Sequence, residues 1–243
     1  MLTKVKNSIP LLILTLFLSS CGGDKYIKPP LDTIIRDMPS DRVFSILLYD
    51  MDVQGNFSRD YYHQYRIIEE TTPGKPEERL TEWYKVDEKY FNQHADNMGM
   101  TIASRGEDGK LEKTVAPPGY NNYVGNPKYG SWQGSGTNSF WAFYGQYAFM
   151  SSMFNLATYP VRRSYYDGYR GNYYGRGRSY YGPTTSGRPY YGTNSSYTQS
   201  TRPNSSWSRN TSTFKQRVSG RTSRSGSRYS GSSSRSRGGG YGK

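Results

Sequence analysis

The sequence has little of the chemistry that enzymes use. Its 243 residues include one cysteine, Cys21, and two histidines, so no internal disulfide can form. There is no phosphate-binding loop, nucleophile elbow or zinc-binding helix motif, and His63 and His94 fall on different expected elements. We therefore expect no catalytic residues, no metal site and no cofactor.

The last third of the chain has almost no aliphatic residues. Residues 161–243 contain Val161 and Val218 but no Leu, Ile, Met or Ala, and their sixteen basic residues face one acidic residue, Asp167. Folding costs roughly 1–2 kcal/mol of backbone entropy per residue, and such a segment has little apolar surface whose burial could offset this cost. We expect residues 160–243 to form a disordered basic tail.

The N-terminus carries a secretory signal. Lys4 and Lys6 precede an apolar run at residues 9–18, which is too short to span a bilayer, and small residues follow it. The motif Leu18-Ser19-Ser20-Cys21 resembles the lipobox of bacterial lipoproteins. That resemblance implies cleavage before Cys21, a diacylglycerol on its thiol, and acylation of the new amino group. The alternative is an ordinary cleaved signal that happens to contain a cysteine.

The same resemblance indicates where the mature chain lies. It places the protein in the cell envelope, anchored in a membrane by lipid. In proteobacterial lipoproteins an Asp directly after the cysteine signals retention at the inner membrane. Here Asp24 comes two places later, so the outer membrane is favoured if the source has two membranes.

The middle of the chain predicts a small α+β domain with an antiparallel sheet. Runs rich in β-branched and aromatic residues predict strands at residues 42–49, 61–68, 80–86, 100–104 and 111–116. Asp87 is expected to cap the single helix, which would run to about Met98. We expect this division of the chain: a signal peptide at 1–20, a tether at 21–40, the domain at 41–116, a Gly/Tyr/Asn-rich loop at 117–138, an uncharged aromatic helix at 139–159, and the tail at 160–243.

Residues 139–159 carry no charge. Their aromatic and Met positions recur at helical spacing. Three interpretations remain open for this segment: packing on the domain, lying in the membrane interface, or presenting a face to a protein partner.

The tail combines arginine with tyrosine and glycine. Four Tyr-Tyr pairs, each followed by Gly directly or one residue later, alternate with arginines. Guanidinium groups pair with phosphate, carboxylate and sulfate. The candidate polyanion-binding residues are Arg162, Arg163, Arg170, Arg176, Arg178 and Arg188.

These patterns predict a non-catalytic envelope lipoprotein. Its partners would be the membrane, an anionic envelope polymer or lipid headgroups, or an envelope protein. One alternative is an enzyme or small-ligand binder that uses the carboxylates of the 41–116 domain, such as Asp50, Asp52, Glu69 and Glu70. Another is a nucleic-acid-binding tail, which the secretory signal disfavours, and a third is a solvated linker without a dedicated ligand.

Overall fold

The computed structural model describes residues 27–55 and 58–209. The predicted signal peptide at residues 1–20, the candidate lipidation site Cys21 and residues 210–243 of the predicted tail lie outside the described residues.

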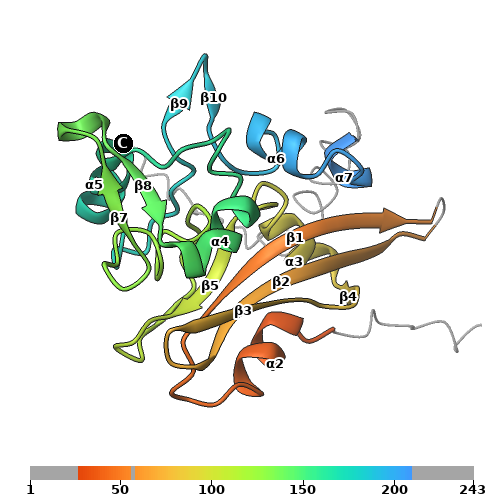
Figure 1. The fold of residues 1–243 in the computed structure, drawn as a ribbon. Helices are drawn as coiled ribbons and strands as arrows, with labels where there is room; N and C mark the ends of the chain where they lie inside the picture. Colours follow the sequence, from red (N-terminus) through yellow and green to blue (C-terminus); the bar gives the residue numbers. More distant parts are fainter. Residues whose placement is uncertain (1–26, 56–57, 210–243) are drawn as a thin grey trace, which may run out of the picture.

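An antiparallel sheet of six strands forms the centre of the molecule (Figure 1). The order is β3-β2-β1-β5-β6, and β4 also pairs with β2. The strands are β1 (Phe44–Gln54), β2 (Asp60–Thr72), β3 (Lys75–Leu80), β4 (Tyr84–Val86), β5 (Thr101–Arg105) and β6 (Leu111–Glu112). Helices accompany this sheet, so the α+β fold class is confirmed.

Both faces of the sheet are covered. Ile67 and Ile68 are fully buried neighbours on β2, and they belong to two different apolar clusters. Since successive side chains of a strand point to opposite faces, the two clusters lie on opposite sides of the sheet. Burial on both sides explains why residues 43–48 form an almost continuous apolar run.

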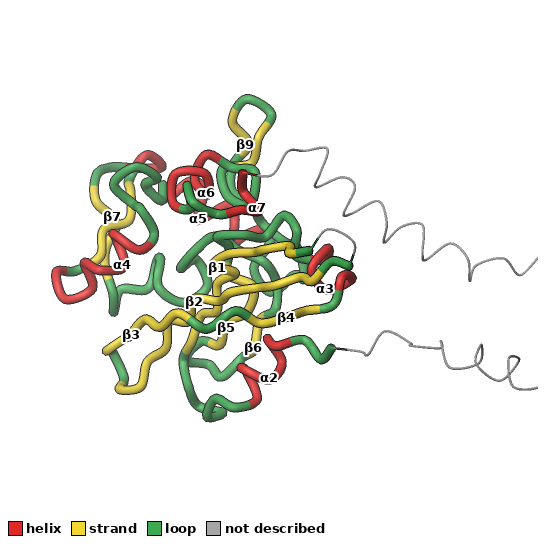
Figure 2. Tube along the Cα trace, turned by 90° about the vertical axis from the view of Figure 1, so that its right-hand side faces the viewer, coloured by secondary structure: helices red, strands yellow, loops and turns green. Residues whose placement is uncertain are grey.

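Helices α2 (Pro30–Arg36) and α3 (Glu88–Gln93) contribute to the first cluster. The remaining elements are β7 (Gly130–Gln133), η2 (Gly136–Asn138), β8 (Phe140–Phe143), η3 (Gly145–Tyr147), α4 (Ala148–Met153), α5 (Arg163–Asn172), β9 (Thr184–Thr185), β10 (Arg188–Pro189), α6 (Ser196–Thr201) and α7 (Ser206–Arg209). Both views place the β9–β10 hairpin and α2 at opposite ends of the molecule (Figures 1 and 2). Among the described residues, no helix is long and apolar enough to cross a membrane.

Most predicted elements of residues 41–116 are present. The first two strands pair antiparallel, and the Asp87 carboxylate caps α3 by accepting from Tyr90 N at 2.7 Å. The helix ends at Gln93 rather than near Met98. A tight turn at Pro73-Gly74 leads from β2 into β3, with Thr72 paired to Lys75. Gly74 adopts a φ of +75°, which suits glycine at such a turn.

The predicted tether is wrong in part. Residues 30–36 form α2, and Leu31, Ile34 and Ile35 are buried in the first cluster. Burial of these three apolar side chains stabilises the packing of the segment on the sheet. The folded unit therefore begins before residue 41.

The predicted single helix at residues 139–159 is also wrong. The segment contains β8, η3 and α4, and β8 pairs with β7. Trp141, Met150 and Phe154 are buried in the second cluster, so these residues pack on the domain. Pairing between β7 and β8 requires residues 130–133, which the local helical pattern does not include.

The predicted disorder of residues 160–243 is wrong for residues 160–209. This part forms α5, β9, β10, α6 and α7, and it buries Tyr169, Tyr191, Tyr197 and Trp207. Tyrosine and tryptophan supply the apolar area that aliphatic residues do not provide here. The folded unit therefore continues far beyond residue 116.

Candidate functional site

The Tyr-Tyr-Gly repeats form the packed layer beneath the candidate polyanion-binding arginines. Tyr180 and Tyr191 of two repeats are buried, and Gly175, Gly182 and Gly192 adopt φ values of +67°, +82° and +97°. Because glycine enters this left-handed region readily, each of these repeats turns the chain after its tyrosine pair. The repeat therefore serves packing and chain reversal in the structure.

The tyrosines of the tail pack around Tyr120 of the preceding loop. Its ring centroid lies 5.7 Å from that of Tyr166, 5.5 Å from Tyr169, 6.4 Å from Tyr180 and 6.2 Å from Tyr191. Such aromatic pairs are worth about 0.5–1.5 kcal/mol beyond their buried area. These contacts fix α5 against the loop at residues 117–126 and leave the arginines on the outside.

All six candidate arginines are exposed. Arg163 lies on α5 with its guanidinium 5.9 Å from the Trp132 ring centroid. Arg170 lies over Tyr174 at 3.8 Å, and Arg178 lies over Tyr173 at 5.1 Å. The remaining three are Arg162 at the N-cap position of α5, Arg176, which follows this helix, and Arg188 on β10.

The candidate arginines differ from the other cations in their ion pairs. Within residues 27–55 and 58–209, only Arg163 of the six pairs with a carboxylate, that of Asp167 at 3.6 Å. By contrast, seven cations between residues 27 and 128 form ion pairs: Arg36, Arg66, Arg79, Lys85, Lys110, Lys113 and Lys128. The positive charge of the tail is thus largely uncompensated on the surface.

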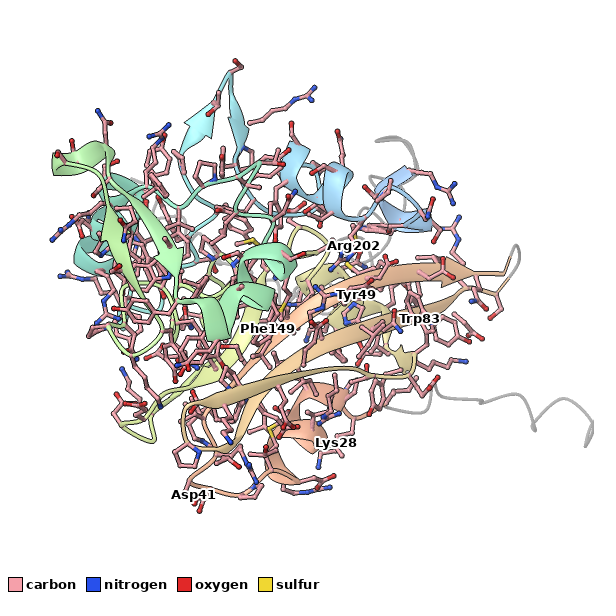
Figure 3. All side chains as sticks on the ribbon, in the orientation of Figure 1. Lys28, Asp41, Tyr49, Trp83, Phe149 and Arg202 are labelled. Carbon is pink, nitrogen blue, oxygen red and sulfur yellow. The ribbon has the colours of Figure 1, made fainter. Side chains whose placement is uncertain are left out.

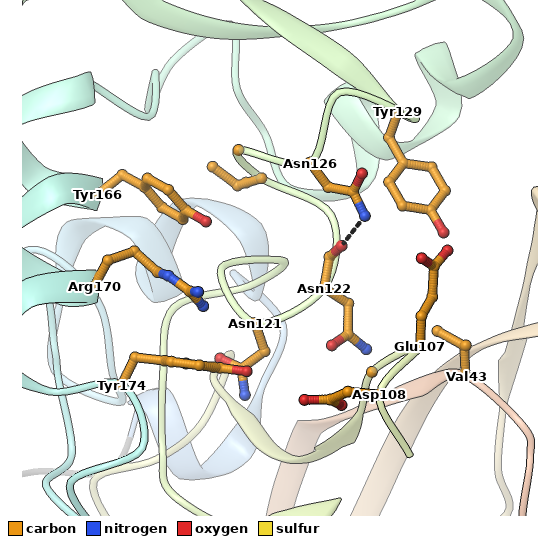
Figure 4. A pocket seen from close by; sticks show the side chains of 13 residues that line it. Val43, Glu107, Asp108, Asn121, Asn122, Asn126, Tyr129, Tyr166, Arg170 and Tyr174 are labelled. Carbon is orange, nitrogen blue, oxygen red and sulfur yellow. Dashed lines mark hydrogen bonds between the residues drawn. The ribbon is translucent and has the colours of Figure 1, made fainter. Parts of the chain in front are cut away.

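Arg170 borders a polar cavity of about 230 Å³. Figure 4 shows Arg170 and Tyr174 on one side of it, and Asn122 and Asp108 on the other. The Asn122 amide donates to Phe44 O at 2.8 Å, so the sheet holds this side chain in place. The cavity therefore lies between α5 and the sheet, with the Arg170 guanidinium at its edge.

A neighbouring asparagine is held in the same way. Asn121 donates to Ser104 Oγ at 2.6 Å and accepts from the Tyr169 hydroxyl at 2.7 Å. Sequence reasoning missed both asparagines. Their loop has no period, and their partners on the sheet and α5 are far away in the chain, so no local signal identifies them.

The structure brings the two histidines together. The ring centroids of His63 on β2 and His94 after α3 are 6.0 Å apart. His63 Nδ1 lies 3.1 Å from the Tyr65 hydroxyl, and His94 Nδ1 lies 3.0 Å from Asn97 Nδ2. Burial lowers the pKa of His94 to about 4 and that of His63 well below its usual value. In the described part of the chain, no three His, Cys, Asp or Glu side chains are grouped so that they could hold a metal ion.

The carboxylates of the alternative acid–base site all bond to structural partners. Asp50 accepts from Ser205 Oγ at 2.5 Å, and its pKa is raised by burial. Asp52 accepts from the Ser206 hydroxyl, and Glu69 pairs with Arg79 at 3.0 Å. Glu70 is buried and binds Lys128 at 3.1 Å, together with the Tyr129 hydroxyl. These contacts connect β1 to the C-terminal segment, β2 to β3, and β2 to the residues directly before β7.

Comparison with known proteins adds nothing to this picture. No family model, curated protein or solved structure matches the chain.

Proposed function

We propose that this chain is a non-catalytic, lipid-anchored protein of the cell envelope whose C-terminal arginines bind anionic surface. The observation that carries the proposal is the set of exposed arginines without a carboxylate partner in residues 160–209. The ligand would present phosphate or carboxylate groups on an envelope polymer or on lipid headgroups.

The charge distribution supports a surface ligand rather than an internal role. Seven cations between residues 27 and 128 pair with neighbouring carboxylates, as Lys113 does with Asp32 at 2.7 Å. Arg170 and Arg178 of the tail instead contact tyrosine faces, which hold a guanidinium in position without neutralising it. An anionic polymer would supply the missing countercharge.

Cys21 supports attachment to a membrane. The signal segment and the motif around Cys21 are typical of lipoproteins. At about 0.8 kcal/mol per buried methylene, two or three acyl chains hold a protein far more firmly than one. Because the protein would be held at the membrane, its tail arginines would encounter envelope polymers or headgroups at high local concentration.

Labelling with palmitate tests the anchor. We expect the wild-type chain to incorporate labelled palmitate and Cys21→Ala to accumulate as an unlabelled, uncleaved precursor. Cleavage is read from the mass of the purified product. Labelling that persists in Cys21→Ala, or an unlabelled wild-type product in the cytosol, would contradict the anchor.

Binding to vesicles and polymers tests the arginines. The soluble probe is the chain from residue 22 onward, compared on phosphatidylglycerol–phosphatidylcholine vesicles, phosphatidylcholine vesicles and lipopolysaccharide. The test variant carries Gln at Arg162, Arg170, Arg176 and Arg178. At roughly 1 kcal/mol for each cation near an anionic surface, binding should weaken at least tenfold and should fall steeply with salt.

A matched variant controls for net charge. It carries Gln at Arg36, Arg79, Lys85 and Lys113, which are exposed but ion-paired, with side-chain exposures of 62%, 51%, 50% and 50%. Both variants remove four positive charges. Equal losses in the two variants, or binding that is insensitive to salt, would refute a specific role of the tail arginines. Tighter binding to RNA than to any envelope anion would favour a nucleic-acid ligand.

A further inference from the structure

A second cavity, of about 580 Å³, lies between the sheet and two helical segments. Its wall includes Arg66 of β2, Phe149 and Met153 of α4, and Arg202 directly after α6. None of these residues belongs to the candidate polyanion site. Figure 3 shows Arg202, Tyr49 and Phe149 in this region, at the face of β1 and β2 below α6.

A β-bulge lies next to Arg66 and Arg202 of this cavity. Leu48 pairs with Tyr65 and Asp50 pairs with Gln64, so Tyr49 is an extra residue on β1. Bulges release backbone groups from the ladder and redirect a side chain, and they are frequent beside binding sites. Here the freed carbonyl of Tyr49 accepts from Arg202 Nε at 3.1 Å.

Two guanidinium groups meet the Tyr49 ring. Arg202 Cζ lies 3.6 Å from the ring centroid and Arg66 Cζ lies 4.7 Å from it. Arg202 also donates from Nη1 to Thr201 O at 2.6 Å, but it forms no ion pair within the described ranges. Burial and the like charge of Arg66 lower the pKa of Arg202. Two like charges held together in a partly buried place favour an anion between or beside them.

The Asp50 carboxylate acts on Arg202 without forming an ion pair with it, whereas the Glu78 carboxylate pairs with Arg66. The Glu78 carboxylate lies 2.8 Å from Arg66 Nε, and its side chain is 34% exposed. An entering oxyanion would compete with Glu78 for the Arg66 guanidinium. The Nη2 group of Arg202 makes no hydrogen bond to residues 27–55 or 58–209 and could donate to the anion. Removal of Glu78 should therefore strengthen binding of an anion at this place.

The opposite wall supplies polar and apolar surface. Asn155 adopts a φ of +52°, which is uncommon for a residue other than glycine. The side chains of Asn155 and Ser152 line the cavity, and neither makes a hydrogen bond within the described part of the chain. Phe149 is 37% exposed and borders the same space, so an apolar group could rest against it.

From these contacts we infer that Arg66 and Arg202 form a binding site for a small oxyanion ligand. The ligand carries a phosphate or carboxylate group, which the two guanidinium groups hold by charge-assisted hydrogen bonds. Its apolar body lies against Phe149 and Met153, and Ser152 and Asn155 offer further polar contacts. This site is independent of the lipid anchor and of the polyanion-binding arginines.

Titration with small aryl anions tests the site. Phenyl phosphate and benzoate are added to the chain from residue 22 onward and followed by calorimetry and by chemical shifts of the residues around Tyr49. We expect saturable binding of at least one aryl anion and none of neutral benzamide, which has the same ring. The anion that binds more tightly identifies the headgroup, and comparison of phenyl phosphate with inorganic phosphate measures the contribution of the ring.

Three variants distinguish a ligand-binding role of Arg66 from a purely structural role. Arg66→Gln should weaken binding of the aryl anion by roughly tenfold or more, because it removes a charge-assisted contact. Glu78→Gln should strengthen binding severalfold, because it frees Arg66. Arg79→Gln should leave binding unchanged, because this arginine follows Glu78 on β3, points to the other face and pairs with Glu69 at 3.0 Å.

Thermal unfolding of each variant confirms that it is folded. No saturable binding of either aryl anion to the folded chain would overturn the inference. So would equal binding of benzamide, or the same affinity in Arg66→Gln, Glu78→Gln and Arg79→Gln. Loss of vesicle binding in the tail-arginine variant leaves this site intact, so the two proposals fail separately.

Discussion

The paired histidines should make the folded state sensitive to acid. His63 is fully buried, its Nε2 has no hydrogen-bond partner within residues 27–55 and 58–209, and His94 lies beside it. In both residues burial favours the neutral ring and lowers the pKa. A lowered histidine pKa means that the unfolded chain binds the proton first. The stabilisation is therefore complete above pH 6.5 and is lost progressively as the pH falls.

The size of the effect follows from the environment of His94. Burial lowers its pKa from 6.5 to about 4. A tenfold change in proton affinity corresponds to about 1.4 kcal/mol, so His94 alone should remove about 3 kcal/mol of stability between these two pH values. His63 adds a loss of the same sign. Domains of this kind have a total stability of about 5–15 kcal/mol, so the loss is a large fraction of it.

Urea unfolding at a series of pH values measures this dependence. We expect the free energy of unfolding to fall between pH 6.5 and 4 in the wild type, and the slope to be smaller in His63→Phe. Near neutral pH this variant loses the contact with the Tyr65 hydroxyl, which costs about 1 kcal/mol. The chain has two histidines, so the histidine slope belongs to this pair. A flat profile in the wild type, or an unchanged slope in His63→Phe, would refute the reasoning.

Further changes test the packing by urea unfolding. Trp207→Ala should cost about 3–5 kcal/mol because its ring is buried against the core, whereas a solvated tail would tolerate the change. Gly192→Ala should cost about 1–3 kcal/mol, since φ is +97° and the new Cβ would lie 2.7 Å from a backbone oxygen. Gly168→Ala in α5 meets no atom within 4 Å and should instead stabilise by about 0.5–1 kcal/mol. Asp87→Ala removes the cap of α3 and should cost about 0.5–2 kcal/mol, and no change would contradict the capping contact.

Local patterns were sufficient for three strands of the sheet and for the start of α3, but not for β3 or for the bounds of β4 and β6. Runs rich in β-branched and aromatic residues predicted the strands β1, β2 and β5, and Asp87 predicted the start of α3. These signals are local, because strand and helix periods are written in neighbouring residues. The extra residue at Tyr49 left no such signal, since a bulge depends on how two strands pair.

The candidate sites were only partly visible in the sequence. The exposed arginines of residues 160–209 could be selected by composition. Their lack of carboxylate partners and the asparagines beside Arg170 depend on contacts between distant segments. The same holds for Arg66 and Arg202, which are far apart in the chain and meet at the Tyr49 ring.

The sequence by itself determined the signal pattern around Cys21, the uneven charge and the antiparallel character of the central sheet. Tertiary structure alone decided that residues 160–209 belong to the folded unit, because aromatic rings gain their stabilisation from partners elsewhere in the chain. Tyr169 and Tyr180 illustrate this. The sequence around them is typical of a solvated linker, but in the structure their rings pack against Tyr120.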